Sequence, residues 1–228
     1  MKKSIAFLPK KNREDLKYLV ELILDKIPVC EMIILYGSYA RGTYVSYDER
    51  EEFGIPTSFK SDYDILVINS AWGYEKIENK LVSVRNIYDK RGDHRYRVPV
   101  QFIHDSIKKV NEDLKYSRYF YTELKRDGIM LYNSGNNKLA RRKPLNFGEI
   151  KKQGEEYFRY AEHILKQLSS DDYLAQEGGN HGFILLHSVG SFPHDSEIDT
   201  PLNYADYYYL EALKRYKDLK EKSENPSY

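Results

Sequence analysis

Two acidic side chains stand two residues apart at the start of an apolar run. Asp62 and Asp64 belong to the stretch SDYDILVIN, whose apolar part predicts a buried strand. Residues at i and i+2 of a strand point to the same face, so the two carboxylates would lie close together. Like charges this close repel unless a cation lies between them, and oxygen-only ligands suit Mg²⁺ best. The pair therefore predicts a site for one Mg²⁺ ion or two.

A glycine-serine turn precedes this pair. Gly37 and Ser38 follow the apolar run Met32 to Tyr36 and open a short segment that can begin a helix and includes Arg41. Free backbone N–H groups and a hydroxyl at such a turn suit a phosphate. Taken alone, an ordinary turn with a capping serine is the commoner interpretation. The carboxylate pair downstream changes that balance, because a phosphate cradle beside a metal site predicts phosphoryl or nucleotidyl transfer.

The order strand, Gly-Ser, helix and Asp-x-Asp resembles the superfamily of nucleotidyltransferases related to DNA polymerase beta. Within it, GSYARG followed by SDYDILV resembles the minimal nucleotidyltransferases, and HDSIKKVNEDL and YFYTELKRDGIMLYNSG extend the likeness through residues 1–140. The resemblance implies an α+β domain with a mixed sheet and flanking helices. It implies Asp62 and Asp64 as catalytic metal ligands and Gly37, Ser38 and Arg41 as nucleotide contacts.

The same resemblance implies a reaction. A nucleoside triphosphate, with ATP expected, would lose its nucleoside monophosphate to a hydroxyl of an acceptor. The acceptor would be a small molecule similar to an antibiotic, or a protein. Neither the acceptor nor the base preference follows from the residues.

A third carboxylate, which many members of the superfamily place on the next strand, is replaced in this chain. The matching position in VPVQFIH is Gln101. A neutral amide neither neutralises a cation nor accepts a proton as a base. Asp105 either replaces it or caps the following helix. A second function is therefore open, a catalytically silent nucleotide-binding or interaction module related to toxin–antitoxin MNT-HEPN proteins.

Apolar periodicity predicts the elements around these residues. Helices are expected over 12–27, with Asn12 as the N-cap, and over 74–88, 106–114 and 116–127, with Gly128 ending the last of them; strands are expected over 31–36, 98–104 and 129–132. Residues 44–60 predict a loop or short hairpin, either a flap that binds the acceptor or a solvated decoration. The basic stretch 90–97 reads as a solvated connection more readily than as a contact for phosphates.

The second half predicts a helical bundle. After a linker over 139–144, helices are expected over 147–168, 181–189 and 202–222. Residues 145–228 resemble a shortened HEPN domain, most clearly in FILLHS. Arg159 and His163 are too close for the Arg-x4–6-His motif of HEPN ribonucleases, so ribonuclease activity is not expected. So few apolar residues predict a partner, and a homodimer through this bundle is one hypothesis.

Composition limits the remaining classes. The 228 residues carry a net charge of +1, which makes nucleic acid an improbable partner and gives an RNA-binding regulator little support. Cys30 is the only cysteine and excludes an internal disulfide. No apolar run approaches the length of a membrane span, so a cytoplasmic protein is expected.

Overall fold

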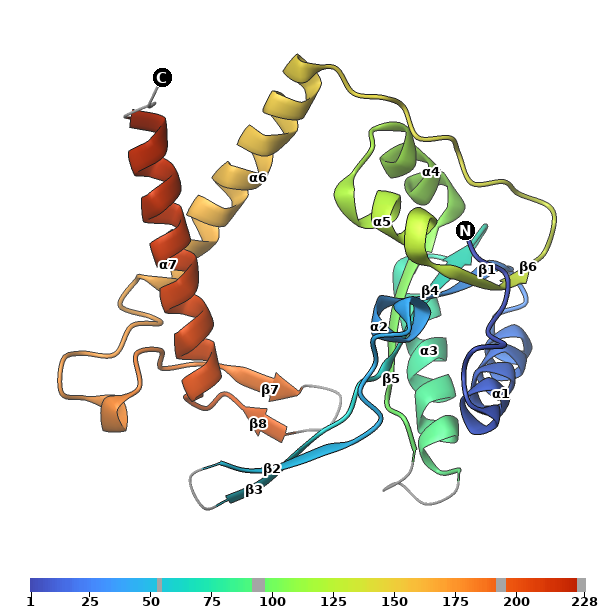
Figure 1. The fold of residues 1–228 in the computed structure, drawn as a ribbon, viewed down its shortest axis with the longest axis horizontal. Coiled ribbons are helices and arrows are strands. Elements are labelled where there is room, and N and C mark those ends of the chain that lie inside the picture. Colours follow the sequence, from blue (N-terminus) through green and yellow to red (C-terminus); the bar gives the residue numbers. More distant parts are fainter. Residues whose placement is uncertain (53–54, 92–96, 192–195, 225–228) are drawn as a thin grey trace. The chain divides into compact units, whose positions relative to one another are not determined.

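The computed structural model describes residues 1–52, 55–91, 97–191 and 196–224 (Figure 1). The chain divides into two compact units, residues 1–145 and residues 146–228. Each unit has its own buried apolar cluster and is described by itself.

The first unit is built on a four-stranded sheet in the order β5-β4-β1-β6. The strands are β1 (Cys30–Tyr36), β4 (Tyr63–Asn69), β5 (Val100–Ser106) and β6 (Ile129–Asn133). β4 and β5 are parallel, whereas β1 is antiparallel to both β4 and β6. The predicted mixed sheet with flanking helices is therefore confirmed, and every strand lies within a few residues of its expected place.

Helices cover both faces of this sheet. The helices α1 (Lys10–Lys26) and α3 (Tyr74–Asp89) share one buried cluster with Ile65 and Val67 of β4. The helices α4 (Ile107–Lys115) and α5 (Tyr119–Asp127) share a second cluster with Leu66 and Ile68. Alternate residues of β4 thus point to opposite cores, as the pleat of a strand requires. The same alternation puts Asp62 and Asp64 on the face of α4 and α5.

One predicted helix start is wrong in detail. Asn12 is not the N-cap of α1, which begins two residues earlier after Pro9, and its side-chain amide donates instead to the hydroxyl of Tyr63 at 2.7 Å. Gly128 ends α5 as predicted, with extended backbone. A Cβ at Gly128 would lie 2.4 Å from the carbonyl oxygen of Leu124, so close packing is what requires glycine there.

The stretch between the glycine-serine turn and the aspartates forms the predicted short hairpin. Its strands β2 (Asp48–Glu52) and β3 (Ile55–Phe59) pair antiparallel, with Asp48 opposite Phe59. The backbone N–H of Ser61 donates to the carbonyl of Val45 at 2.9 Å and closes the base of the hairpin. Whether this hairpin binds an acceptor stays a prediction.

Over 146–191 and 196–224, the parts of the second unit that the structure describes, there are two long helices rather than the three expected. α6 (Phe147–Leu168) begins with a capping box made by Asn146 and Glu149, and α7 (Asn203–Glu224) matches the last predicted helix. The helix expected over 181–189 is wrong. A 3₁₀ turn, Asn180–Gly182, stands at its start, and the short strands β7 (Val189–Ser191) and β8 (Ser196–Ile198) form a hairpin at its end.

Long-range hydrogen bonds explain this departure. The backbone N–H groups of Ile184 and Leu185 donate to the two carboxylate oxygens of Asp206 at 2.8 and 2.9 Å instead of to a preceding turn. Gly182 has φ of +92°, which a right-handed helix does not allow. An apolar sequence therefore forms extended backbone, because its donors are satisfied by a residue of α7.

The predicted linker follows the first unit closely. The backbone N–H of Ala140 donates to Asn111 at 2.6 Å, and the hydroxyl of Ser117 donates to the carbonyl of Lys143 at 2.5 Å. These bonds tie residues 139–144 to α4 and to the turn after it. Within the described part of the chain, no helix has both the length and the apolar character needed to span a membrane.

Candidate functional site

Three side chains form a row across the sheet at one end of β4. Tyr36 is the antiparallel register partner of Asp64, and Gln101 is its parallel partner on the other side. Register partners point to the same face of a sheet, so the phenol, the carboxylate and the amide lie side by side. This places Gln101 where the resemblance expects the third carboxylate. Tyr36 was not predicted from the sequence, although its position directly before Gly37 was a usable signal.

The glycine-serine turn lies directly against Asp64. Gly37 has φ of +69°, and a Cβ built on it would lie only 1.9 Å from Oδ2 of Asp64. No side chain larger than hydrogen fits between this backbone and the carboxylate. The turn opens α2 (Gly37–Arg41), which contains Ser38 and Arg41 and ends at Gly42 in the left-handed region. The fold therefore brings Gly37 into contact with Asp64, with Ser38 and Arg41 on the following turn.

Electrostatics set Asp64 apart from an ordinary surface carboxyl. Burial and, to a lesser extent, the negative charge of Asp62 raise its pKa from 3.8 to about 6, and the guanidinium of Arg41 opposes them. The same two aspartates, together with burial, raise the pKa of the Tyr36 phenol above its usual range. Negative charge is thus concentrated at this end of the sheet, and a bound cation would relieve the repulsion.

The donor set fits Mg²⁺ held jointly with a substrate. Among the described residues, no three acidic, histidine or cysteine side chains gather closely enough to form a metal cluster. Mg²⁺ is typically bound by one or two carboxylates together with substrate phosphates and water. Asp62 and Asp64 meet that requirement, with the remaining ligands left to a triphosphate.

Asp105 and His104 do not join this pair. Asp105 accepts a hydrogen bond from the hydroxyl of Tyr121 and lies 4.0 Å from the ammonium of Lys109. It does not cap α4 either, because Ser106 accepts the backbone N–H of Lys109. His104 is buried on the opposite face, 3.1 Å from Glu78. This pairing favours a structural role for His104.

The basic stretch after α3 is balanced by nearby carboxylates. Arg91 lies 3.8 Å from Asp15, and Arg97 lies 3.4 Å from Asp89. Residues 92–96 of this stretch lie outside the described part of the chain. The described arginines therefore favour a solvated connection rather than a phosphate contact.

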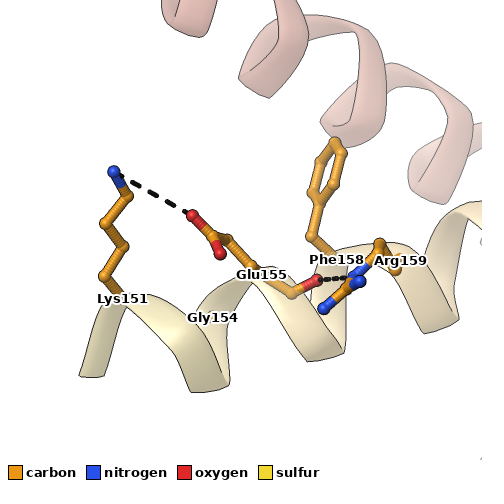
Figure 2. A pocket seen from close by; sticks show the side chains of 5 residues that line it. All are labelled: Lys151, Gly154, Glu155, Phe158 and Arg159. Atoms are coloured by element: carbon orange, nitrogen blue, oxygen red, sulfur yellow. Dashed lines mark hydrogen bonds and ion pairs between the residues drawn. The ribbon is translucent and has the colours of Figure 1, made fainter. Parts of the chain in front are cut away.

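The side chains that line a hollow on the second unit are not arranged to bind a ligand or to catalyse a reaction. Figure 2 shows that its lining comes from one helix, α6, with Lys151, Gly154, Glu155, Phe158 and Arg159. The ammonium of Lys151 lies 4.0 Å from Glu155, and Nε of Arg159 donates to the carbonyl of Glu155. Phe158 points toward α7 and stacks on Tyr216. These side chains pair along the helix or pack, and they do not converge on a ligand.

Comparison with known proteins gives several partial likenesses. No protein-family model matches the chain. A stretch of 63 residues is 48% identical to an unsaturated glucuronyl hydrolase of Formosa agariphila and covers 28% of this chain and 16% of the relative. A solved unsaturated glucuronyl hydrolase specific for heparin is 62% identical over 32% of this chain and 20% of its own, with a TM-score of 0.29. The chain thus spans about a sixth of the length of its curated relative.

Other solved structures that resemble the chain are nucleotidyltransferases. A spectinomycin adenyltransferase of Enterococcus faecialis, solved with ATP and spectinomycin, is 14% identical over 70% of both chains, with a TM-score of 0.41. A complex of a Shewanella oneidensis HEPN toxin with its MNT antitoxin gives 12% identity over 69% of this chain and 98% of the other, with a TM-score of 0.33. Both TM-scores lie below 0.5, so these likenesses say nothing about the site.

Proposed function

We propose that the first unit is a Mg²⁺-dependent nucleotidyltransferase that takes a nucleoside triphosphate, with ATP expected. The observation that carries the proposal is the contact of Gly37 with Asp64 beside Asp62. A backbone turn that suits phosphate then lies against one of the two carboxylates that suit a cation. This is the combination that a triphosphate–Mg²⁺ complex requires.

In this proposal each residue has a separate task. Gly37 and Ser38 hold the phosphates through backbone N–H groups and the hydroxyl, and Arg41 adds a positive charge near them. Asp62 and Asp64 would hold the cation, and the bound cation would neutralise phosphate charge. An acceptor oxygen attacks the α-phosphorus and pyrophosphate leaves. Catalysis then depends on positioning and on charge neutralisation rather than on a covalent intermediate.

A second candidate is a module that binds the nucleotide but does not turn it over. The amide of Gln101 beside Asp64 favours it, because the position offers no carboxylate to hold a second cation or accept a proton. The two candidates share the binding site and differ in product. Pyrophosphate release separates them.

The proposal assigns no chemistry to the second unit. The stretch FILLHS, which carried the HEPN resemblance, is not helical, so a HEPN-like activity is not proposed. A hydrolase activity is not proposed either, because the likeness covers so little of the relative. The exposed rings of Tyr160, Tyr207 and Tyr208 favour the homodimer hypothesis for this unit. Light scattering that shows a monomer at micromolar concentration would count against the dimer.

The test is pyrophosphate release from each of the four nucleoside triphosphates with Mg²⁺. Glycerol and inorganic phosphate are both supplied, because the acceptor is unknown. We expect release by the wild type and a loss of at least about 100-fold in the Asp62→Asn/Asp64→Asn variant, the scale of removing charge stabilisation from a transition state. Asp25→Asn, an exposed aspartate paired with Lys26, is the matched control. Nucleotide binding without release in the wild type would favour the silent module.

A further inference from the structure

Among the residues that the structure describes, the Gln101 side of the site, where the acceptor would bind, offers no proton-accepting side chain other than the two aspartates. Gln101 lies directly beside Asp64 and on the same face of the sheet. Within the residues that the structure describes, no hydrogen bond holds its half-exposed amide. An amide cannot remove a proton from an attacking hydroxyl, but its NH₂ group can donate a hydrogen bond to an oxygen anion.

The other titratable groups on this face are unsuitable as bases. Asp62 and Asp64 hold the cation in the proposed function. Tyr36 lies on β1, on the other side of Asp64 from Gln101. Asp105 lies four residues along β5 from Gln101, about 13 Å away at about 3.3 Å per residue, and is engaged by Tyr121. His104 points to the other face.

The charge balance leads to the same result. Gln101 is neutral and adds no further negative charge beside Asp62 and Asp64. A carboxylate in its place would repel an approaching anion. Ile103, which follows on the same face of the edge strand β5, is exposed and also neutral. The acceptor side is therefore open to an anion and offers it a donor.

From this arrangement we infer that the acceptor oxygen is already anionic at neutral pH, as in a carboxylate or a phosphate monoester, and that Gln101 is the residue that determines this specificity. The inference rests on the proposed function. A lone pair of the anionic oxygen forms the new bond to the α-phosphorus. The bond from that phosphorus to the bridging oxygen breaks, and pyrophosphate leaves with its electron pair. No proton has to be removed from the acceptor, so the missing base costs nothing.

The test compares three small acceptors that need no recognition of a larger scaffold. Inorganic phosphate and acetate are anions, and glycerol offers only hydroxyls. With labelled ATP and Mg²⁺, transfer to phosphate yields ADP and transfer to acetate yields an adenylate that hydroxylamine traps. We expect the wild type to prefer the anions to glycerol by about tenfold or more. Phosphate and acetate, read separately, show which type of anion the site takes.

The matched variant is Gln101→Asp, which adds a base and a negative charge. We expect it to raise transfer to glycerol by about 100-fold, the scale of general base catalysis, and to lower transfer to the anions. Gln101→Asn, which keeps the amide, should retain the wild-type preference. Equal or better use of glycerol by the wild type would overturn the inference, as would failure of Gln101→Asp to gain glycerol transfer.

Equilibrium binding separates this inference from the proposal beneath it. A non-hydrolysable ATP analogue with Mg²⁺ is titrated into the wild type and into Gln101→Asp. No binding to either would contradict the proposed nucleotide site itself. Binding to both, with no transfer to phosphate or acetate by the wild type, would overturn only the anionic acceptor.

Discussion

The two units of this chain bury their apolar residues in different ways. In the first unit a central sheet separates two buried clusters, and β1 and β4 contribute fully buried residues to both. In the second unit the described buried cluster consists of Leu165, Leu185 and Tyr209. The first unit can therefore hold charged groups close together at one end of its central strand β4, because the packed strands on either side fix the backbone there. The small buried cluster described for the second unit does not fix its backbone in this way.

The largest expected difference between the units is the cost of removing a buried leucine. Leu66 of β4 is fully buried, and Leu66→Ala should lower the free energy of unfolding of the first unit by about 3 kcal/mol. Leu165→Ala, in the small cluster of α6, should cost the second unit about half as much. Hydrogen exchange read separately for residues 1–145 and 146–228 measures both. An equal loss of free energy of unfolding in the two units would contradict the proposed difference in their packing.

Gly37→Ala tests how tightly the first unit is packed at its site. The new methyl group would collide with Asp64, and the left-handed backbone adds about 1 kcal/mol of strain. We expect a loss of about 2 kcal/mol in the free energy of unfolding, measured by urea denaturation, with loss of nucleotide affinity. Gly135→Ala is the matched control, because φ there is +86° and nothing lies within 4 Å of a new Cβ. If the control lost as much, strain alone would explain the result.

The second unit depends on one buried carboxylate. Asp206 accepts the backbone N–H groups of Ile184 and Leu185. Asp206→Asn leaves one of those donors facing an NH₂ group, so we expect a loss of about 1–2 kcal/mol that is confined to residues 146–228. Hydrogen exchange at Ile184 and Leu185 reports it. Asp218→Asn, on the exposed part of the same helix, should change nothing.

Asp64→Asn should raise the free energy of unfolding, whereas the preceding substitutions lower it. The pKa of Asp64 is raised to about 6 in the folded protein, so ionising it opposes folding. The stability that comes from the protonated form is complete below the ordinary pKa of 3.8 and is lost as pH rises through about 6. At pH 7 without Mg²⁺, Asp64→Asn should therefore stabilise the protein by about 1 kcal/mol, allowing for solvent screening.

The measurement is thermal unfolding of the wild type and of Asp64→Asn between pH 4 and pH 7. The two curves should converge at low pH and separate as pH rises through about 6. A variant less stable than the wild type at pH 7 would mean that Asp64 is held by favourable contacts rather than against repulsion.

Local sequence patterns were sufficient to predict much of the structure of the first unit. The apolar run of β4 predicted a buried strand, the i, i+2 spacing put Asp62 and Asp64 on one face, and helical periodicity predicted α3 and α6 almost to the residue. The glycine-serine turn and the aspartates were found because their signals lie next to apolar strands. The contact between Gly37 and Asp64 could not be read in advance, because it depends on how β1 pairs with β4.

The errors all arose from partners distant in sequence. Asn12 was predicted as a cap but donates to Tyr63, 51 residues away. The helix expected over 181–189 fails because Asp206, about twenty residues later, takes its backbone donors. Local apolar content does not reveal where a backbone donor will find its acceptor.

The most direct test of the central claim is the affinity of a non-hydrolysable ATP analogue, measured by calorimetry with and without Mg²⁺. We expect the wild type to bind it at least about tenfold more tightly with Mg²⁺, and the Asp62→Asn/Asp64→Asn variant to lose that dependence. Asp25→Asn should behave as the wild type. An affinity that is the same with and without Mg²⁺, or that the double variant retains in full, would contradict the claim that this turn and these aspartates form a nucleotide–metal site.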